Sequence, residues 1–126
     1  MATSLWEKLR DIPYWSNPSI WIHGDLLLGN ILIKNNRLSA VIDFSDLGLG
    51  DPACDLLPAW CLFNSESIQI FKANLQHIDK NTWLRGKGWA LSIALILLPY
   101  YKTRSPVMAE LARHMLKNIF SEEKHD

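Results

Sequence analysis

Apolar residues gather first in two short runs, residues 31–33 and 38–42, separated by the pair Asn35 and Asn36. Asparagine tolerates the left-handed backbone conformation that tight hairpin turns require. Short apolar runs on either side of such a turn predict a β-hairpin. A third short run, residues 20–22, predicts a strand that leads into the loop before the hairpin.

Beyond the hairpin, the apolar spacing changes to that of helices. Asp51 and Pro52 are typical of a helix start and predict a helix that reaches about residue 63, kinked or shortened by Pro58. Ser65 is expected to cap the next helix. Its predicted apolar face consists of Ile68, Phe71, Leu75 and Ile78.

Three further helices complete the predicted elements. A capping box at Ser4 predicts a short helix over residues 5–10, and Asn81 or Thr82 is expected to open a helix over residues 83–98 that ends at Pro99. Ser105 and Pro106 predict the start of the last helix, and the polar residues 121–126 are expected to fray. The last helix has the apolar stripe Met108, Leu111, Ala112, Met115, Leu116 and Ile119.

A small β element followed by four helices predicts one α+β domain over residues 1–126, with a mostly helical body. The 126 residues suffice for one domain with a modest core. Hydrophobic residues make up 48% and charged residues 21%, which is ordinary for a soluble globular protein. The formal net charge of +0 gives no electrostatic case for binding nucleic acid or an anionic membrane.

Cysteine usage and the absence of targeting patterns predict a cytoplasmic protein. Cys54 and Cys61 on one helix would be separated by roughly 10 Å along its axis, too far for a disulfide, so reduced and buried thiols are expected. The N-terminus lacks the pattern of a signal peptide. The longest apolar stretch, residues 89–101, is shorter than the roughly 20 residues that span a bilayer, and it predicts a core helix.

Three polar side chains occupy the ends of the predicted hairpin. Asp25 and Asn30 precede its first strand, and Asp43 follows its second strand. A hairpin brings its outer ends together, so these side chains are expected to converge, and their oxygen ligands suit Mg²⁺. Singly, each acid is explained as a turn cap and Asn30 as a left-handed turn residue. Their joint arrangement favours a site.

The motifs around these residues resemble those of a known family. The chain contains His23-Gly24-Asp25 with Asn30 five positions later, then Asp43-Phe44-Ser45, and then Gly50-Asp51-Pro52 followed by Asp55-Leu56. These motifs are similar to those of the aminoglycoside phosphotransferase family, which includes relatives of choline and homoserine kinases. Protein kinases carry the comparable motifs H-R-D-x-x-x-x-N and D-F-G. The resemblance covers about residues 6–95 and is densest over residues 22–60.

This resemblance implies a role for each of the three side chains. Asp25 would be the catalytic base toward a small-molecule hydroxyl, such as an aminoglycoside-like or choline-like acceptor. Asn30 and Asp43 would hold Mg²⁺, with ATP as the phosphoryl donor.

The neighbouring polar residues are expected to be structural. His23 would brace the backbone near the metal-binding acid, Asp51 would cap a helix, and Asp55 would reach back to the catalytic loop. Asp46 could face the pocket, and its role is open. Lys34 and Arg37, beside the hairpin turn, are expected to be solvated.

Three departures from the family pattern affect the expected activity. Leu27 and Leu28 stand where many relatives have polar residues, and Ser45 replaces the glycine of D-F-G. Only residues 1–22 precede His23, and no glycine-rich loop or V-A-I-K-like strand lysine is found. The sequence therefore predicts the C-terminal lobe portion of a kinase-like fold without its N-lobe, weak or inactive alone unless a partner supplies that lobe.

Two alternatives belong to other functional classes. The first is a non-catalytic remnant that serves as a binding or oligomerisation module. A homodimer of this module would bury apolar surface. The second is a metallophosphoesterase, superficially similar at Gly24-Asp25 and Gly29-Asn30. A two-metal site needs several His and Asp ligands on separate strands, and only four histidines are present, so we do not favour the second.

Overall fold

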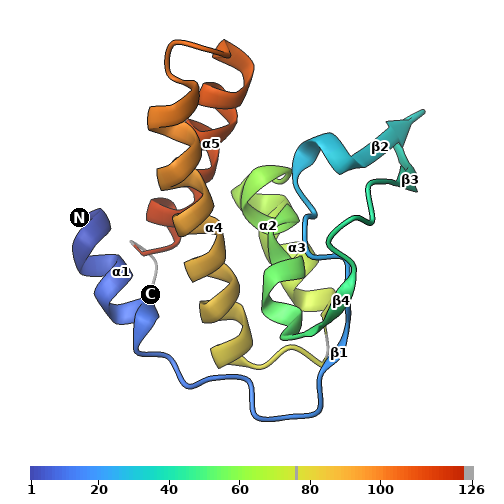
Figure 1. The fold of residues 1–126 in the computed structure, drawn as a ribbon, viewed down its shortest axis with the longest axis vertical. Coiled ribbons are helices and arrows are strands. Elements are labelled where there is room, and N and C mark those ends of the chain that lie inside the picture. The colour runs from blue at the N-terminus through green and yellow to red at the C-terminus, as the bar shows by residue number, and fades with distance from the viewer. Residues whose placement is uncertain (76, 124–126) are drawn as a thin grey trace.

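The computed structural model describes residues 1–75 and 77–123. Figure 1 shows helices packed side by side, with the strands gathered along one side of them. The helices and strands, in chain order, are α1 (Ala2–Arg10), β1 (Ile20–Ile22), β2 (Ile31–Lys34), β3 (Arg37–Val41), β4 (Gly48–Gly50), α2 (Pro58–Cys61), α3 (Ser65–Asn74), α4 (Lys80–Tyr101) and α5 (Pro106–Glu122), with short 3₁₀ helices η1 (Leu28–Asn30) and η2 (Pro52–Leu56).

The predicted hairpin and the mixed α+β class are confirmed. Strands β2 and β3 pair antiparallel, and the turn residues Asn35 and Asn36 have φ values of 52° and 58°. Positive φ values at both turn residues are typical of a two-residue hairpin, because the twist of such a turn matches the twist of the two strands. Strand β1 was also predicted, but its antiparallel partner β4 was not, because β4 is built around two glycines and carries no apolar run.

Helix α1 begins earlier than predicted. Its N-cap is Met1, which makes no side-chain cap bond, so the expected capping box at Ser4 is wrong. The first turn is closed by the backbone N–H of Leu5, which donates to the carbonyl oxygen of Met1 at 3.1 Å. Leu5 and Leu9, four positions apart on one face of the helix, are 5% and 7% exposed. Burial of this face, which packs mainly against α4, outweighs the local capping preference.

The segment after Asp51 forms two short helices in place of one. The side chain of Asp51 accepts a hydrogen bond from the backbone N–H of Ala53 and begins η2, and Pro58 begins α2. Proline lacks the backbone N–H that a continuous helix would need, so the break falls at Pro58 as predicted. The next cap is wrong by one residue, since Asn64 and not Ser65 accepts from Ser67 N at 2.8 Å.

Helix α4 is longer than predicted at both ends. Asp79 is its N-cap and accepts from Thr82 N at 2.6 Å, in place of the expected Asn81 or Thr82. Pro99 lies within the helix and does not end it. A proline this close to the C-terminus removes only one internal hydrogen bond, so the last turn continues to Tyr101.

The core lies between α4, α5 and the η2–α2 segment. Trp60 is fully buried and packs at 4.9 Å, ring centre to ring centre, on Trp83. Gly86 permits the close approach of α4 to η2, because a Cβ there would lie 3.0 Å from the carbonyl oxygen of Ala53 and 3.0 Å from Leu56.

Helix α5 begins at Pro106 with Ser105 as its N-cap, as predicted. It extends to Glu122, so the expected fraying is wrong for residues 121 and 122, while residues 124–126 lie outside the described residues. The reason is Lys87, which is 1% exposed and pairs with Glu122 at 3.2 Å and Glu123 at 2.9 Å. A buried ammonium requires such partners, and they order the end of α5.

Both cysteines are buried free thiols, as predicted. Within residues 1–75 and 77–123, no helix is long and apolar enough to cross a membrane. The cytoplasmic location stays a prediction.

Candidate functional site

Asp25 and Asn30 are in direct contact at the start of the hairpin. The side-chain nitrogen of Asn30, the last residue of η1, donates to the backbone oxygen of Asp25 at 2.8 Å and to its carboxylate Oδ2 at 3.0 Å. Both partners are acceptors, so this end of the Asn30 amide must be the NH₂ group. No described residue donates to the amide oxygen of Asn30, so this oxygen can accept another ligand.

Asp43 is tied to the same place through its neighbour Ile42. The backbone N–H of Ile42 donates to the backbone oxygen of Asn30 at 3.0 Å. Asp43 follows directly with φ of 59°, a left-handed conformation that turns the chain out of the strand. The structure thus brings Asp43 beside Asn30 through the backbone, whereas Asp25 and Asn30 meet through their side chains.

The carboxylate of Asp43 is exposed and hydrogen-bonded to Ser45. Its Oδ1 accepts from the Ser45 hydroxyl at 2.7 Å and from the Ser45 backbone N–H at 3.4 Å. These bonds hold the pKa of Asp43 below its ordinary value. Asp43 is therefore ionised at neutral pH, which a cation ligand requires.

His23 joins the two halves of the site. It is 7% exposed; its Nδ1 accepts the backbone N–H of Asp25 at 3.2 Å, and its Nε2 lies 2.8 Å from the carbonyl oxygen of Ile42. The first bond needs a lone pair on Nδ1 and the second needs a proton on Nε2, which assigns the neutral Nε2–H tautomer. The ring also meets Phe44 edge to face at 4.6 Å.

Asp55 holds the backbone of the same loop from η2. One carboxylate oxygen accepts from His23 N at 2.7 Å and the other from Gly24 N at 2.9 Å. Gly24 has φ of 88°, and a Cβ there would lie 2.7 Å from the backbone oxygen of Asp46. Only glycine fits this position, and Asp46 contributes its backbone to the packing.

Asn30 and Asp43 are the residues of this site that could hold a cation. Within the described ranges, no group of three or more His, Cys, Asp and Glu residues is placed to hold a metal ion. Mg²⁺ is usually bound through one or two carboxylates together with waters and substrate phosphates. An ionised carboxylate at Asp43 and an amide oxygen at Asn30 are ligands of that kind.

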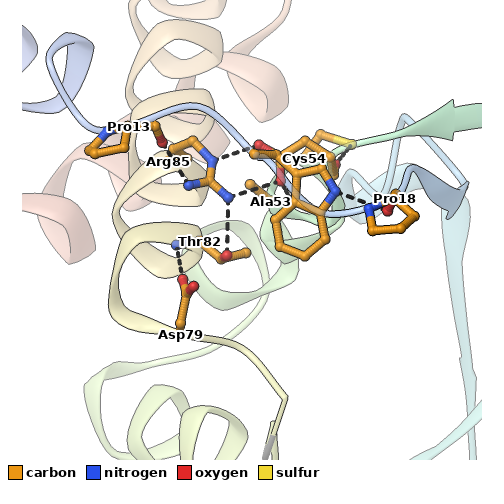
Figure 2. Close-up of polar contacts among 9 residues, drawn as sticks. Pro13, Pro18, Ala53, Cys54, Asp79, Thr82 and Arg85 are labelled. Carbon is orange, nitrogen blue, oxygen red and sulfur yellow. Dashed lines mark hydrogen bonds and ion pairs between the residues drawn. The ribbon is translucent and has the colours of Figure 1, made fainter.

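Arg85 is a positioning residue that no sequence motif indicates. Its guanidinium donates to Asp51 Oδ2 at 2.6 Å, to the carbonyl oxygen of Pro13 at 2.9 Å and to Thr82 Oγ1 at 3.0 Å (Figure 2). Its Cζ also lies 5.7 Å from the ring centre of Trp15. Arg85 thereby fixes the segment that leads into β1 against α4 and η2. Asp51 lies 34 positions away, so no local pattern could have indicated the pair.

Two curated proteins are similar to parts of this chain. The chain is 34% identical over 71 residues to the uncharacterized protein YcbJ of Bacillus subtilis (strain 168), covering 52% of this chain and 23% of that protein. It is 38% identical over 55 residues to the lysine-specific demethylase JMJ21 of Arabidopsis thaliana, covering 34% of this chain and 6% of that protein. The chain thus spans less than a quarter of the length of either relative.

No solved structure matches the chain at a significant level. A family model described as "Phosphotransferase enzyme family" matches residues 1–89, which include the whole loop-and-hairpin site and the start of α4. This match covers more than half of the sequence, and the chain therefore belongs to the phosphotransferase enzyme family.

Proposed function

We propose that this chain carries the catalytic loop and metal ligands of an ATP- and Mg²⁺-dependent phosphotransferase acting on a small-molecule hydroxyl. Family membership supports a phosphotransferase-type function. The observation that carries the finer proposal is the placement of Asn30. Its side chain binds Asp25, its backbone oxygen binds Ile42 beside Asp43, and its amide oxygen stays available.

Asp25 is the proposed base. Its Oδ2 accepts from Asn30, and its Oδ1 has no donor among the described residues. A carboxylate oxygen held in this way can accept the proton of an incoming hydroxyl or orient that hydroxyl. The bond from Asn30 and the bond from Asp25 N to His23 hold the base in position.

Asn30 and Asp43 are the proposed Mg²⁺ ligands. When bound, the ion would neutralise charge on the donor phosphates. The protein's own contribution is the fixed amide oxygen of Asn30 and the ionised carboxylate of Asp43. Ser45 supports the second of these by its hydrogen bond.

We further propose that these elements correspond to the C-terminal lobe of a protein-kinase-like fold. The surface around the loop and strands is markedly apolar: Trp21 is 69% exposed, Leu49 62% and Phe44 53%. A nucleotide-covering lobe, in this protein or in a partner, would bury such side chains. Residues 1–126 alone are expected to turn over weakly or not at all, since positioning supplies most of the catalysis.

The same exposed surface favours one alternative, a non-catalytic binding or oligomerisation module. Leu28 is 39% exposed in the loop between Asp25 and Asn30, where it offers no polar contact to an acceptor. A homodimer that buries this surface without binding nucleotide would support the alternative.

Calorimetry with ATP and Mg²⁺ tests the proposal. We expect the parent chain to bind ATP only with Mg²⁺, and Asp43→Ala to lose this binding. Asp46→Ala is the matched control, since it removes an exposed carboxylate three positions away, and it should bind as the parent does. Equal binding by the parent and Asp43→Ala, or no binding by a folded parent, would reject the metal site and favour the module.

A further inference from the structure

A large cavity lies away from the proposed site, between α1, the end of α3 and the start of α4. Its volume is about 630 Å³, within the range of roughly 300–1,000 Å³ that is usual for small-molecule sites. None of its lining residues belongs to the loop or the hairpin. Figure 1 shows α1 on the opposite side of α4 from β2 and β3.

The floor of the cavity is apolar and rigid. Leu9, Leu75 and Trp83 contribute to it from three different segments. Trp83 is 3% exposed and is held from behind by its contact with Trp60. A floor of this kind suits an apolar chain or ring more than a hydrated polar molecule.

The rim of the cavity carries an excess of positive charge. Lys8, Lys72 and Lys80 line it, and none of them forms an ion pair with another residue in the described part of the chain. Lys72 is held over the ring of Trp83, with its Nζ 4.8 Å from the ring centre. Its ammonium therefore sits directly above the apolar floor.

The two acids that line the cavity are already engaged. Asp79 caps the N-terminus of α4, where the helix dipole is positive, and Glu123 pairs with the buried Lys87. Among the described lining residues, the three lysines therefore outnumber the two acids, and both acids have other partners. A smaller cavity of about 400 Å³ lies beside the first, and Lys72 and Trp83 line both.

We propose that this cavity binds a small amphipathic anion, with a carboxylate or phosphate head at the rim lysines and an apolar body against Leu9, Leu75 and Leu84. The lysines supply charge complementarity to the head, and the apolar lining residues supply a surface for the body. A cation would be repelled by the rim, and a neutral apolar molecule would leave the ammonium groups unpaired. The site is independent of the phosphotransferase proposal, because it shares no residue with it.

Calorimetry with decanoate, decyl phosphate and decanol tests this proposal on the full chain, at concentrations below micelle formation. We expect one anion per chain, accompanied by a change in tryptophan fluorescence, and clearly weaker binding of decanol. Lys72→Gln should weaken anion binding about fivefold, as expected for one partly exposed charge, and the triple change of Lys8, Lys72 and Lys80 to Gln should weaken it further. A preference of one anion over the other identifies the head group.

Lys34→Gln is the control, because it removes an exposed lysine in the hairpin, and it should leave anion affinity unchanged. Leu84→Trp should fill the cavity and block all three probes in a chain whose melting curve stays cooperative. Equal binding of decanol and decanoate, equal losses in Lys34→Gln and Lys72→Gln, or no anion binding by the parent would overturn the proposal. These lysine variants change exposed side chains only, so they test the charge without threatening the fold.

Discussion

The carboxylate of Asp55 binds the backbone N–H of His23 at 2.7 Å across 32 positions of sequence, and its second oxygen binds the next N–H, that of Gly24, at 2.9 Å. The conformation of the loop that carries Asp25 is therefore fixed from η2, outside the hairpin. His23 adds the second connection by spanning Asp25 and Ile42. The proposed base and the proposed metal ligands thus share one hydrogen-bonded frame.

Asp55→Asn should disrupt this frame. The amide keeps one acceptor oxygen but turns an NH₂ group toward the other backbone N–H, so one part-buried donor loses its partner. We expect a loss of about 1–3 kcal/mol in the free energy of unfolding, measured by urea denaturation. Asp46→Asn removes an exposed carboxylate in the neighbouring loop, and it should change the free energy of unfolding by no more than about 0.5 kcal/mol. Similar losses in both variants would contradict the bracing role.

Arg85→Lys should destabilise the protein although it keeps the charge. A lysine ammonium cannot reproduce the planar fork that reaches Asp51, Pro13 and Thr82 together. We expect a loss of about 1–3 kcal/mol in urea denaturation. Arg113→Lys is the control, since Arg113 is half-exposed in a pair with Glu110 and should tolerate the change. An unchanged unfolding midpoint for Arg85→Lys would refute the role.

Comparison of these residues shows which features the sequence could predict. The hairpin, the break at Pro58 and the start of α5 depend on neighbours in the chain, and they were predicted. The start of α1 depends on burial against α4, and the ordered end of α5 depends on the ion pairs of Lys87. Local sequence patterns therefore predicted both boundaries incorrectly. The motif spacing indicated the candidate residues, whereas the contacts of Arg85 join positions too distant for any spacing to indicate.

Ser45→Ala should raise the pKa of Asp43 toward its ordinary value, because the two bonds from Ser45 favour the ionised carboxylate. NMR titration of the Asp43 carboxyl carbon measures this directly. A lowered pKa stabilises the fold above the ordinary aspartate value, and this contribution is lost as the pH falls through the lowered value. Ser39→Ala, on exposed β3, should leave the titration unchanged. An unmoved Asp43 titration in Ser45→Ala would show that Ser45 is not the cause.

The two thiols should be inert in the folded protein. Burial raises the pKa of Cys54 to about 12 and that of Cys61 to about 11. Thiolate is the reactive form, so a disulfide reagent at pH 8 should label neither until urea is added. The folded state holds these protons more tightly than the unfolded state, so the free energy of unfolding should fall as the pH rises above about 9. Rapid labelling without denaturant would contradict the burial.

We propose that Asn30 and Asp43 form one cation site beside Asp25. Manganese replaces magnesium at such oxygen sites and broadens the NMR signals of nearby amides, so substoichiometric Mn²⁺ added to the ¹⁵N-labelled chain locates the site. We predict selective broadening at Asp25, Asn30, Asp43 and Phe44 that disappears in Asp43→Ala and persists in Asp46→Ala. Broadening centred on other acids, such as Glu122 and Glu123, or unchanged by Asp43→Ala, would rule out a cation site at Asn30 and Asp43.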